Sequence, residues 1–189
     1  MDARRRLAEE LRTHALIIGD VTLSSGAVAS YYVDAKRAIL LPAGFAALAE
    51  LVASRAREYD ASAVGGLTMG AAAPACAALA GGADVKAFFV RKEVKQHGLQ
   101  RRVEGPLLDP AGERCVIVED VVTTGGSTLQ AIEAVRAEGH TVVGVVAVLD
   151  RLAGGAEAIR AAIGDAPYEA LATIDDVHPG RPDRGSRAG

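Results

Sequence analysis

Two adjacent carboxylates, Glu119 and Asp120, stand between an apolar run and a loop of small and hydroxyl-bearing residues. The apolar run, residues 115–118, is short and mostly β-branched, which predicts a buried parallel strand. The loop, residues 123–127, leads into a helical pattern from Leu129, and backbone N–H groups at such a helix N-terminus can hold a phosphate. Acids beside an anion site suit a phosphorylated sugar, because carboxylates accept its hydroxyls while N–H groups bind its phosphate. An ordinary strand–loop–helix turn with an acidic cap is the alternative for this segment.

A second segment, residues 91–98, gathers four potential cations, Arg91, Lys92, Lys95 and His97. It follows the strand expected at residues 85–90, near the place where the acidic segment should also leave the sheet. A cationic loop there can close on a diphosphate leaving group. A solvated charged face is the alternative.

The elements that must position these segments follow from the apolar pattern. Leu7, Leu11, Ala15 and Ile18 have helical spacing, so a first amphipathic helix should run to residue 18. We expect strands at residues 21–23, 31–33, 63–67, 85–90, 115–118, 142–149 and 168–174. Further helices are expected at residues 42–58, 129–138 and 156–163, and one more follows residues 68–71 and ends at residue 80. From residue 63 onward strands and helices alternate, which predicts a parallel sheet with helices on both faces. We therefore expect helix and hood elements in residues 1–60, an α/β core in residues 61–175 and a disordered tail in residues 176–189.

Composition narrows the class of protein. Of 189 residues half are apolar and 4% are aromatic, so a single aliphatic core is expected. A net charge of −3 supplies no basic field for nucleic acid, and no segment has the roughly 20 apolar residues that span a bilayer. Cys76 and Cys115 lie in apolar stretches outside any C-x-x-C pair, which favours buried, reduced thiols. The N-terminus lacks the apolar run of a signal peptide, so a cytoplasmic location is expected.

The segment from Glu119 to Ser127 resembles the phosphoribosyl-diphosphate signature of the type I phosphoribosyltransferases, and it is neither a Walker loop nor a G-x-G-x-x-G. Residues 91–98 resemble the R-K-x-x-K-x-H-G catalytic loop of the orotate phosphoribosyltransferases. Residues 25–34 resemble the N-terminal segment of that family, which carries two adjacent tyrosines and an aspartate. Arg151 lies where the family keeps an arginine for the orotate carboxylate, and residues 68–71 lie where its pyrophosphate loop follows a strand, although this last match is weaker.

The resemblance implies a five-stranded, mainly parallel α/β core under a small hood, in a homodimer whose cationic loops reach into the neighbouring active site. It implies transfer of the phosphoribosyl group to orotate with Mg²⁺ as cofactor, held through substrate oxygens and water with no direct protein ligand, and no nucleic-acid or membrane partner. Lys95, His97, Glu119 and Asp120 would be catalytic, and Thr123 and Arg151 would bind orotate. The residues implied in binding phosphoribosyl diphosphate are Arg91, Lys92, Lys95, His97, Glu119, Asp120, Val121, Val122, Thr123, Thr124, Gly125, Gly126 and Ser127.

One departure concerns Ser24, which stands where many members of that family have a basic residue. Lys36 or Arg37 are the candidates to supply the missing charge. Two other functions remain open at this point: a transferase of the same fold acting on another base such as a purine, and a regulator that senses nucleotides and binds RNA or DNA. A carboxylated base calls for a cation such as Arg151, and the regulator would need a basic surface that the net charge does not supply.

Overall fold

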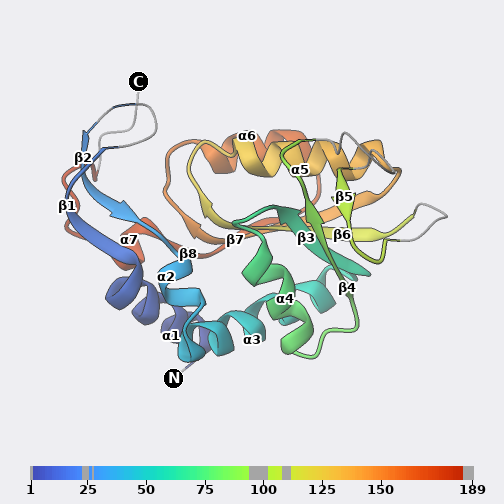
Figure 1. Ribbon diagram of the computed structural model, residues 1–189, viewed down its shortest axis with the longest axis horizontal. Coiled ribbons are helices and arrows are strands. Elements are labelled where there is room, and N and C mark those ends of the chain that lie inside the picture. The colour runs from blue at the N-terminus through green and yellow to red at the C-terminus, as the bar shows by residue number, and fades with distance from the viewer. Residues whose placement is uncertain (1, 23–25, 27, 94–101, 108–111, 185–189) are drawn as a thin grey trace.

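The computed structural model describes residues 2–22, 26, 28–93, 102–107 and 112–184. Its centre is a six-stranded sheet (Figure 1) with the order β5-β4-β3-β6-β7-β8. In that order the strands are β5 (Val103–Glu104), β4 (Lys86–Val90), β3 (Ala63–Leu67), β6 (Arg114–Val122), β7 (Thr141–Asp150) and β8 (Tyr168–Thr173). The five strands from β4 to β8 are parallel, which confirms the mainly parallel α/β fold, and the two-residue strand β5 adds an antiparallel edge.

Helices cover both faces of this sheet (Figure 1). One face carries α5 (Gly126–Ala137) and α6 (Gly155–Ile163), whose side chains Ile132, Val135 and Ile159 share a core with Cys115 and Ile117 of β6. The other face carries α1 (Ala3–Glu10), α3 (Pro42–Glu58) and α4 (Ala72–Ala80). The helix α3, which falls within the expected hood region, therefore packs into the main core rather than apart from it.

The order of the strands reverses between β3 and β6. From β3 the chain continues outward to β4 and β5, and it then returns to build β6, β7 and β8 on the other side. The helix after β3 and the helix after β6 lie on opposite faces of the sheet (Figure 1). Such a switch point leaves a crevice at the carboxyl ends of the strands, where open α/β sheets bind their ligands.

The N-terminal elements differ from the sequence expectation. Helix α1 ends at Glu10, a π-helical turn η1 (Leu11–Ala15) follows, and β1 (Leu16–Thr22) then pairs with β2 (Val28–Val33) in an antiparallel ribbon. The expected helix to residue 18 is thus wrong in its last part. Leu7, Leu11 and Ala15 are buried as their spacing predicted, whereas Ile18 is 66% exposed. Strand pairing of Leu16 with Val33 and of Ile18 with Tyr31 replaces the helical hydrogen bonds.

Strand β6 continues past the expected end at residue 118. It pairs with β7 through Val121↔Leu149 and Val122↔Asp150, so Glu119 and Asp120 lie within the strand rather than just after it. Strand β8 is shorter than expected, because Ile174 begins the one-turn helix α7 (Ile174–Val177). A short helix α2 (Lys36–Ile39), not expected from the sequence, connects β2 to α3.

Two further expectations are corrected. Cys115 is buried, but Cys76 is exposed on α4, because the buried face of this helix is formed by Pro74, Ala75, Ala77 and Ala78. Within the tail expected to be disordered, His178 and Asp183 contact Tyr31 of the N-terminal ribbon. Arg181 forms ion pairs with Asp175 and Asp183, and its side chain is 8% exposed.

Candidate active site

The acid pair lies in the crevice at the switch point. Glu119 is 5% exposed and Asp120 is 8% exposed, and the backbone N–H of Asp120 donates to Glu119 Oε1 at 3.3 Å. Burial, followed by the charge of Asp120, raises the pKa of Glu119 from 4.5 to about 8. Glu119 is therefore mostly protonated near neutral pH, and the pair carries less negative charge than two free carboxylates.

The loop after β3 closes directly on this pair. A Cβ atom built on Gly70 would lie 2.4 Å from both Asp120 Oδ1 and Glu119 Oε1. Only a residue without a side chain leaves the acids in place, which explains a glycine at this position. The weaker sequence match at residues 68–71 therefore belongs to the site.

The glycine loop after β6 leads directly into helix α5. Gly125 has φ +82° and caps the helix, which begins at Gly126, three residues earlier than the sequence suggested. Backbone bonds to the segment after β7 anchor the loop, with Gly155 N donating to Thr123 O at 3.0 Å. Residues 121–128, Glu119 and Gln130 line a cavity of about 330 Å³ at this helix N-terminus. Free N–H groups of the first helical turn and the positive end of the helix dipole favour an anion in that cavity.

A second cavity, of about 580 Å³, lies between the acid pair, the loop after β3 and the hood, by which we mean β1, β2 and α2. Its lining residues are Tyr32, Val33, Lys36, Leu67, Thr68, Met69, Gly70, Lys92, Glu119, Asp120, Val121, Thr123 and Ser127. Lys36 Nζ donates to Asp120 Oδ2 at 3.0 Å and lies 2.8 Å from Asp34 Oδ1. Since Glu119 and Thr123 line both cavities, the two form neighbouring parts of one site.

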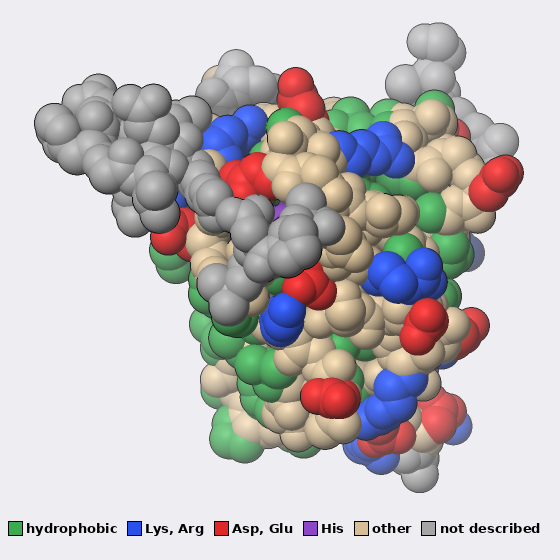
Figure 2. Space-filling model, turned by 90° about the vertical axis from the view of Figure 1, so that its right-hand side faces the viewer, with side chains coloured by type: hydrophobic (Ala, Val, Ile, Leu, Met, Phe, Trp, Pro, Cys, Tyr) green, Lys and Arg blue, Asp and Glu red, His purple; other side chains and the backbone are tan. Residues whose placement is uncertain are grey.

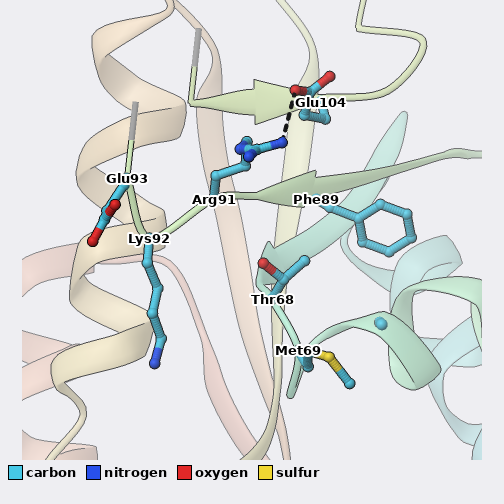
Figure 3. Close-up of a pocket in the computed structure, with 8 residues that line it drawn as sticks. Thr68, Met69, Phe89, Arg91, Lys92, Glu93 and Glu104 are labelled. Carbon is cyan, nitrogen blue, oxygen red and sulfur yellow. Dashed lines mark ion pairs between the residues drawn. The ribbon is translucent and has the colours of Figure 1, made fainter. Parts of the chain in front are cut away.

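The two described cations of the segment after β4 point in different directions (Figure 3). Arg91 points toward β5, where its Nη1 lies 3.6 Å from Glu104 Oε1. Lys92 points away from Glu104, and it lines both the 580 Å³ cavity and a neighbouring cavity of about 650 Å³ beside Thr68 and Phe89. Of the predicted cationic loop, the structure thus brings Lys92 to the acid pair and holds Arg91 at the outer edge. Lys95 and His97 lie outside the described residues.

Arg151 lies in the segment after β7, and it does not line either of the two cavities that contain the acid pair. Its backbone N–H donates to Val122 O at 2.8 Å, and its guanidinium lies 4.9 Å from the centre of the Tyr31 ring, with Nη2 donating to the Tyr31 hydroxyl at 3.2 Å. Arg151 Nε is buried and has no hydrogen-bond partner among the described residues. The Tyr31 hydroxyl in turn donates to Asp183 Oδ2 at 2.9 Å, and the His178 ring meets the Tyr31 ring edge-on.

Neighbouring residues of the sequence make different contacts at two places, Tyr31 with Tyr32 and Asp150 with Arg151. Tyr31 is buried against Arg151 and the C-terminal segment, whereas Tyr32 is half-buried and lines the 580 Å³ cavity. Asp150 does not pair with Arg151, because it accepts the backbone N–H of Leu152 at 2.7 Å and the Tyr168 hydroxyl at 2.7 Å. No local sequence pattern predicts these contacts or the contacts of Lys36, Gly70 and Asp183.

The described residues contain no group of three or more His, Cys, Asp and Glu side chains placed to hold a metal ion. None of the helices in the described ranges is long and apolar enough to cross a membrane. On the face shown in Figure 2, the described Lys and Arg side chains lie close to Asp and Glu rather than in one basic patch.

Comparisons with known proteins agree with this geometry. Residues 38–162 match the family model of the phosphoribosyl transferase domain. The orotate phosphoribosyltransferase of Corynebacterium glutamicum (strain R) is 46% identical over 178 residues, which is 94% of this chain and 95% of the relative. The crystal structure of Mycobacterium tuberculosis H37Rv orotate phosphoribosyltransferase with Fe(III) dicitrate has a TM-score of 0.81 and 43% identity, covering 93% of this chain and 98% of the other.

A second crystal structure of the Mycobacterium tuberculosis protein, in complex with 5-phospho-α-D-ribosyl 1-diphosphate, has a TM-score of 0.77 and 39% identity over the same shares of the two chains. The family model covers most of this chain, and the relatives cover nearly all of it. The chain therefore belongs to the phosphoribosyltransferase family and, within it, to the orotate phosphoribosyltransferases.

Proposed function

We propose that this chain transfers the 5-phosphoribosyl group of phosphoribosyl diphosphate to orotate, giving orotidine 5′-phosphate and pyrophosphate, a step of de novo pyrimidine synthesis. One observation carries the proposal. The buried acid pair of β6 runs without interruption into the glycine loop and the N-terminus of α5, and Glu119 lines the same cavity as that loop, so hydroxyl acceptors and an anion site lie side by side. This arrangement fits a pentose that carries a 5-phosphate.

The acid pair would hold the ribose during the reaction. The reaction is a displacement at the anomeric carbon, in which the bond to pyrophosphate loosens and positive charge builds on the ring before the orotate nitrogen bonds. Glu119 and Asp120 would accept the ribose hydroxyls, and the charge of Asp120 would lend negative potential to that cationic ring. The loop from Thr123 to Ser127 would bind the 5-phosphate through its N–H groups.

The cations after β4 would stabilise the departing pyrophosphate. Lys92 already lines the cavity that contains the acid pair, and Lys95, Arg91 and His97 follow or precede it in the same segment. Mg²⁺, when bound, would neutralise charge on the diphosphate. The site fits an ion held mainly through substrate oxygens and water, because the described residues provide the acid pair but no group of three or more possible metal ligands.

Arg151 and Thr123 would bind the base. Arg151 Nε is buried without a partner among the described residues, so it has a donor left for the orotate carboxylate. Tyr32 lines the neighbouring cavity from the hood and offers a ring beside the base.

The proposal includes a homodimer with shared active sites and a cytoplasmic location. In its favour, Leu40, Met69 and Leu79 are 64%, 77% and 46% exposed, which is apolar surface that a second copy can cover. Free thiols such as Cys76 and Cys115 stay reduced in the cytoplasm. Gel filtration with light scattering tests the dimer, because a monomer at micromolar concentration would contradict it.

A single assay tests the proposed reaction. Loss of orotate absorbance is followed with phosphoribosyl diphosphate and Mg²⁺, and the same mixture is repeated with uracil and with hypoxanthine in place of orotate. Turnover with orotate alone is the expected result. Turnover with hypoxanthine or uracil but not with orotate would favour a transferase for another base, and no turnover with any base would favour a nucleotide sensor.

A further inference from the structure

Lys36 enters the site from an element that carries none of the residues assigned to the reaction. It is the first residue of α2, which follows the hood strand β2, and its side chain is 38% exposed. Its ammonium bridges Asp34 Oδ1 at 2.8 Å and Asp120 Oδ2 at 3.0 Å, across 84 residues of sequence in the second case. The contact therefore ties the hood to the acid pair.

The charges around this contact are unusual for an anion site. Within the described lining of the 580 Å³ cavity, the cations are Lys36 and Lys92, and the acids are Glu119 and Asp120. Burial opposes the charge of Lys36, but hydrogen bonds to Asp34 and Asp120 outweigh it and raise its pKa above the ordinary value. Lys36 thus stays charged at every pH at which the protein works, and its charge balances the acids while no substrate is bound.

The neighbouring basic residue is placed differently. Arg37 is exposed, and it does not line the cavities that contain the acid pair. Of the two candidates for the charge missing at Ser24, only Lys36 reaches the substrate crevice. Because α2 begins beside Asp34, the backbone holds the Lys36 side chain over the acids from the hood side.

A ligand that uses Asp120 must change this contact. A ribose hydroxyl that donates to Asp120 competes with Lys36 for the same oxygen. In phosphoribosyl diphosphate the carbon that bears the diphosphate is bonded to the carbon that bears the 2-hydroxyl, so an ammonium displaced from Asp120 finds diphosphate oxygens within the reach of a lysine side chain. A charged hydrogen bond to phosphate then replaces the ion pair.

We propose that Lys36 is a further substrate-binding residue of this reaction, which holds Asp120 in the empty site and moves to the diphosphate when the ribose hydroxyls take its place. This inference rests on the proposed function, and it extends that function by assigning the charge that is missing at Ser24. With this assignment the hood contributes side chains that bind the diphosphate as well as the base.

The test compares three ligands and three variants. Isothermal titration measures the Kd of phosphoribosyl diphosphate, of inorganic pyrophosphate and of ribose 5-phosphate, each with Mg²⁺, for the parent chain and for Lys36→Gln, Lys36→Arg and Arg37→Gln. Ribose 5-phosphate has the hydroxyls and the 5-phosphate but no diphosphate, so it reports damage to the acid pair alone.

For Lys36→Gln, the Kd of phosphoribosyl diphosphate should rise about tenfold or more, the size of one charged hydrogen bond. The Kd values of ribose 5-phosphate, which has no diphosphate, and of pyrophosphate, which has no hydroxyls to displace Lys36 from Asp120, should change less than about twofold. Lys36→Arg should recover most of the loss, and Arg37→Gln should match the parent. Equal losses for all three ligands, or none, would overturn the assignment.

A crystal structure of the parent chain with phosphoribosyl diphosphate and Mg²⁺ supplies a check that needs no variant to fold. Lys36 Nζ should lie within about 3.2 Å of a diphosphate oxygen. If it stays on Asp120 while the diphosphate binds elsewhere, the inference is wrong. These binding measurements involve no base, so an absence of turnover with orotate would defeat the proposed reaction without deciding the role of Lys36.

Discussion

Glu119 offers a direct measurement of the electrostatics of the site. Its pKa is raised from 4.5 to about 8, first by burial and then by the charge of Asp120. A shift of this size corresponds to at most about 5 kcal/mol of unfavourable free energy, at about 1.4 kcal/mol per unit. The variant Glu119→Gln has the same shape and cannot ionise, so it removes this cost while keeping an acceptor for the Asp120 N–H.

The dependence on pH follows from the sign of the shift. Below about pH 4.5 Glu119 is protonated in both the folded and the unfolded chain, so it does not affect the free energy of unfolding. Between about pH 4.5 and about pH 8 the unfolded chain ionises this group while the folded chain keeps its proton. The stability of the parent relative to the variant therefore falls with rising pH, and the difference levels off above about pH 8.

Urea unfolding at intervals from about pH 5 to about pH 9 measures this difference. Glu119→Gln should be close to the parent near pH 5 and more stable by several kcal/mol at about pH 9. Glu133→Gln, an exposed position, provides the matched control for the removal of one carboxylate. A difference between parent and Glu119→Gln that is constant with pH would refute the raised pKa of Glu119 and the neutral state assigned to it near pH 7.

Three further outcomes are expected from the same structure. Gly70→Ala should lower kcat/KM by about 10²-fold, because the new methyl group would lie 2.4 Å from an oxygen of each acid. The control Gly180→Ala, whose added Cβ has no atom within 4 Å, should match the parent. An active Gly70→Ala enzyme would show that the acids can move freely. Arg151→Gln should raise the KM of orotate about tenfold or more and leave that of phosphoribosyl diphosphate nearly unchanged, and steady-state kinetics showing the opposite split would move Arg151 out of the base site. Lys95→Ala should reduce kcat by about 10²-fold with folding intact, as judged by circular dichroism, and an unchanged kcat would remove that residue from the mechanism.

The parts of the site that the sequence predicts are those encoded within one continuous segment. Residues 119–127 pass from a strand through two acids into a glycine loop and a helix, and each step has its own residue preference. The same holds for the alternation of strands and helices in the core, which follows from apolar runs separated by loops. Strand ends are less well encoded. The extension of β6 to Val122 depends on pairing with β7, and no residue of β6 specifies that partner.

The parts that could not be predicted join segments far apart in the chain. Lys36 meets Asp120 across 84 residues, and the hydroxyl of Tyr31 meets Asp183 across 152 residues. Neither contact has a spacing that a local pattern could indicate, because both arise only when the hood, the sheet edge and the C-terminal segment come together. The tail was expected to be disordered from its composition alone, whereas Arg181 within it forms ion pairs with two aspartates.

The sugar-phosphate cradle and the proposed base site are built from different segments of the chain. The cradle for the sugar phosphate is formed within one strand–loop–helix unit, β6 to α5. The side chains proposed for the base come from β2 and from the segment after β7. Substitutions that alter which base is accepted can therefore accumulate at Tyr32 and Arg151 while the grip on the activated sugar stays intact. In this architecture one phosphate cradle can serve chains with different nucleobase preferences, because Tyr32 and Arg151 lie outside the strand–loop–helix unit that forms the cradle.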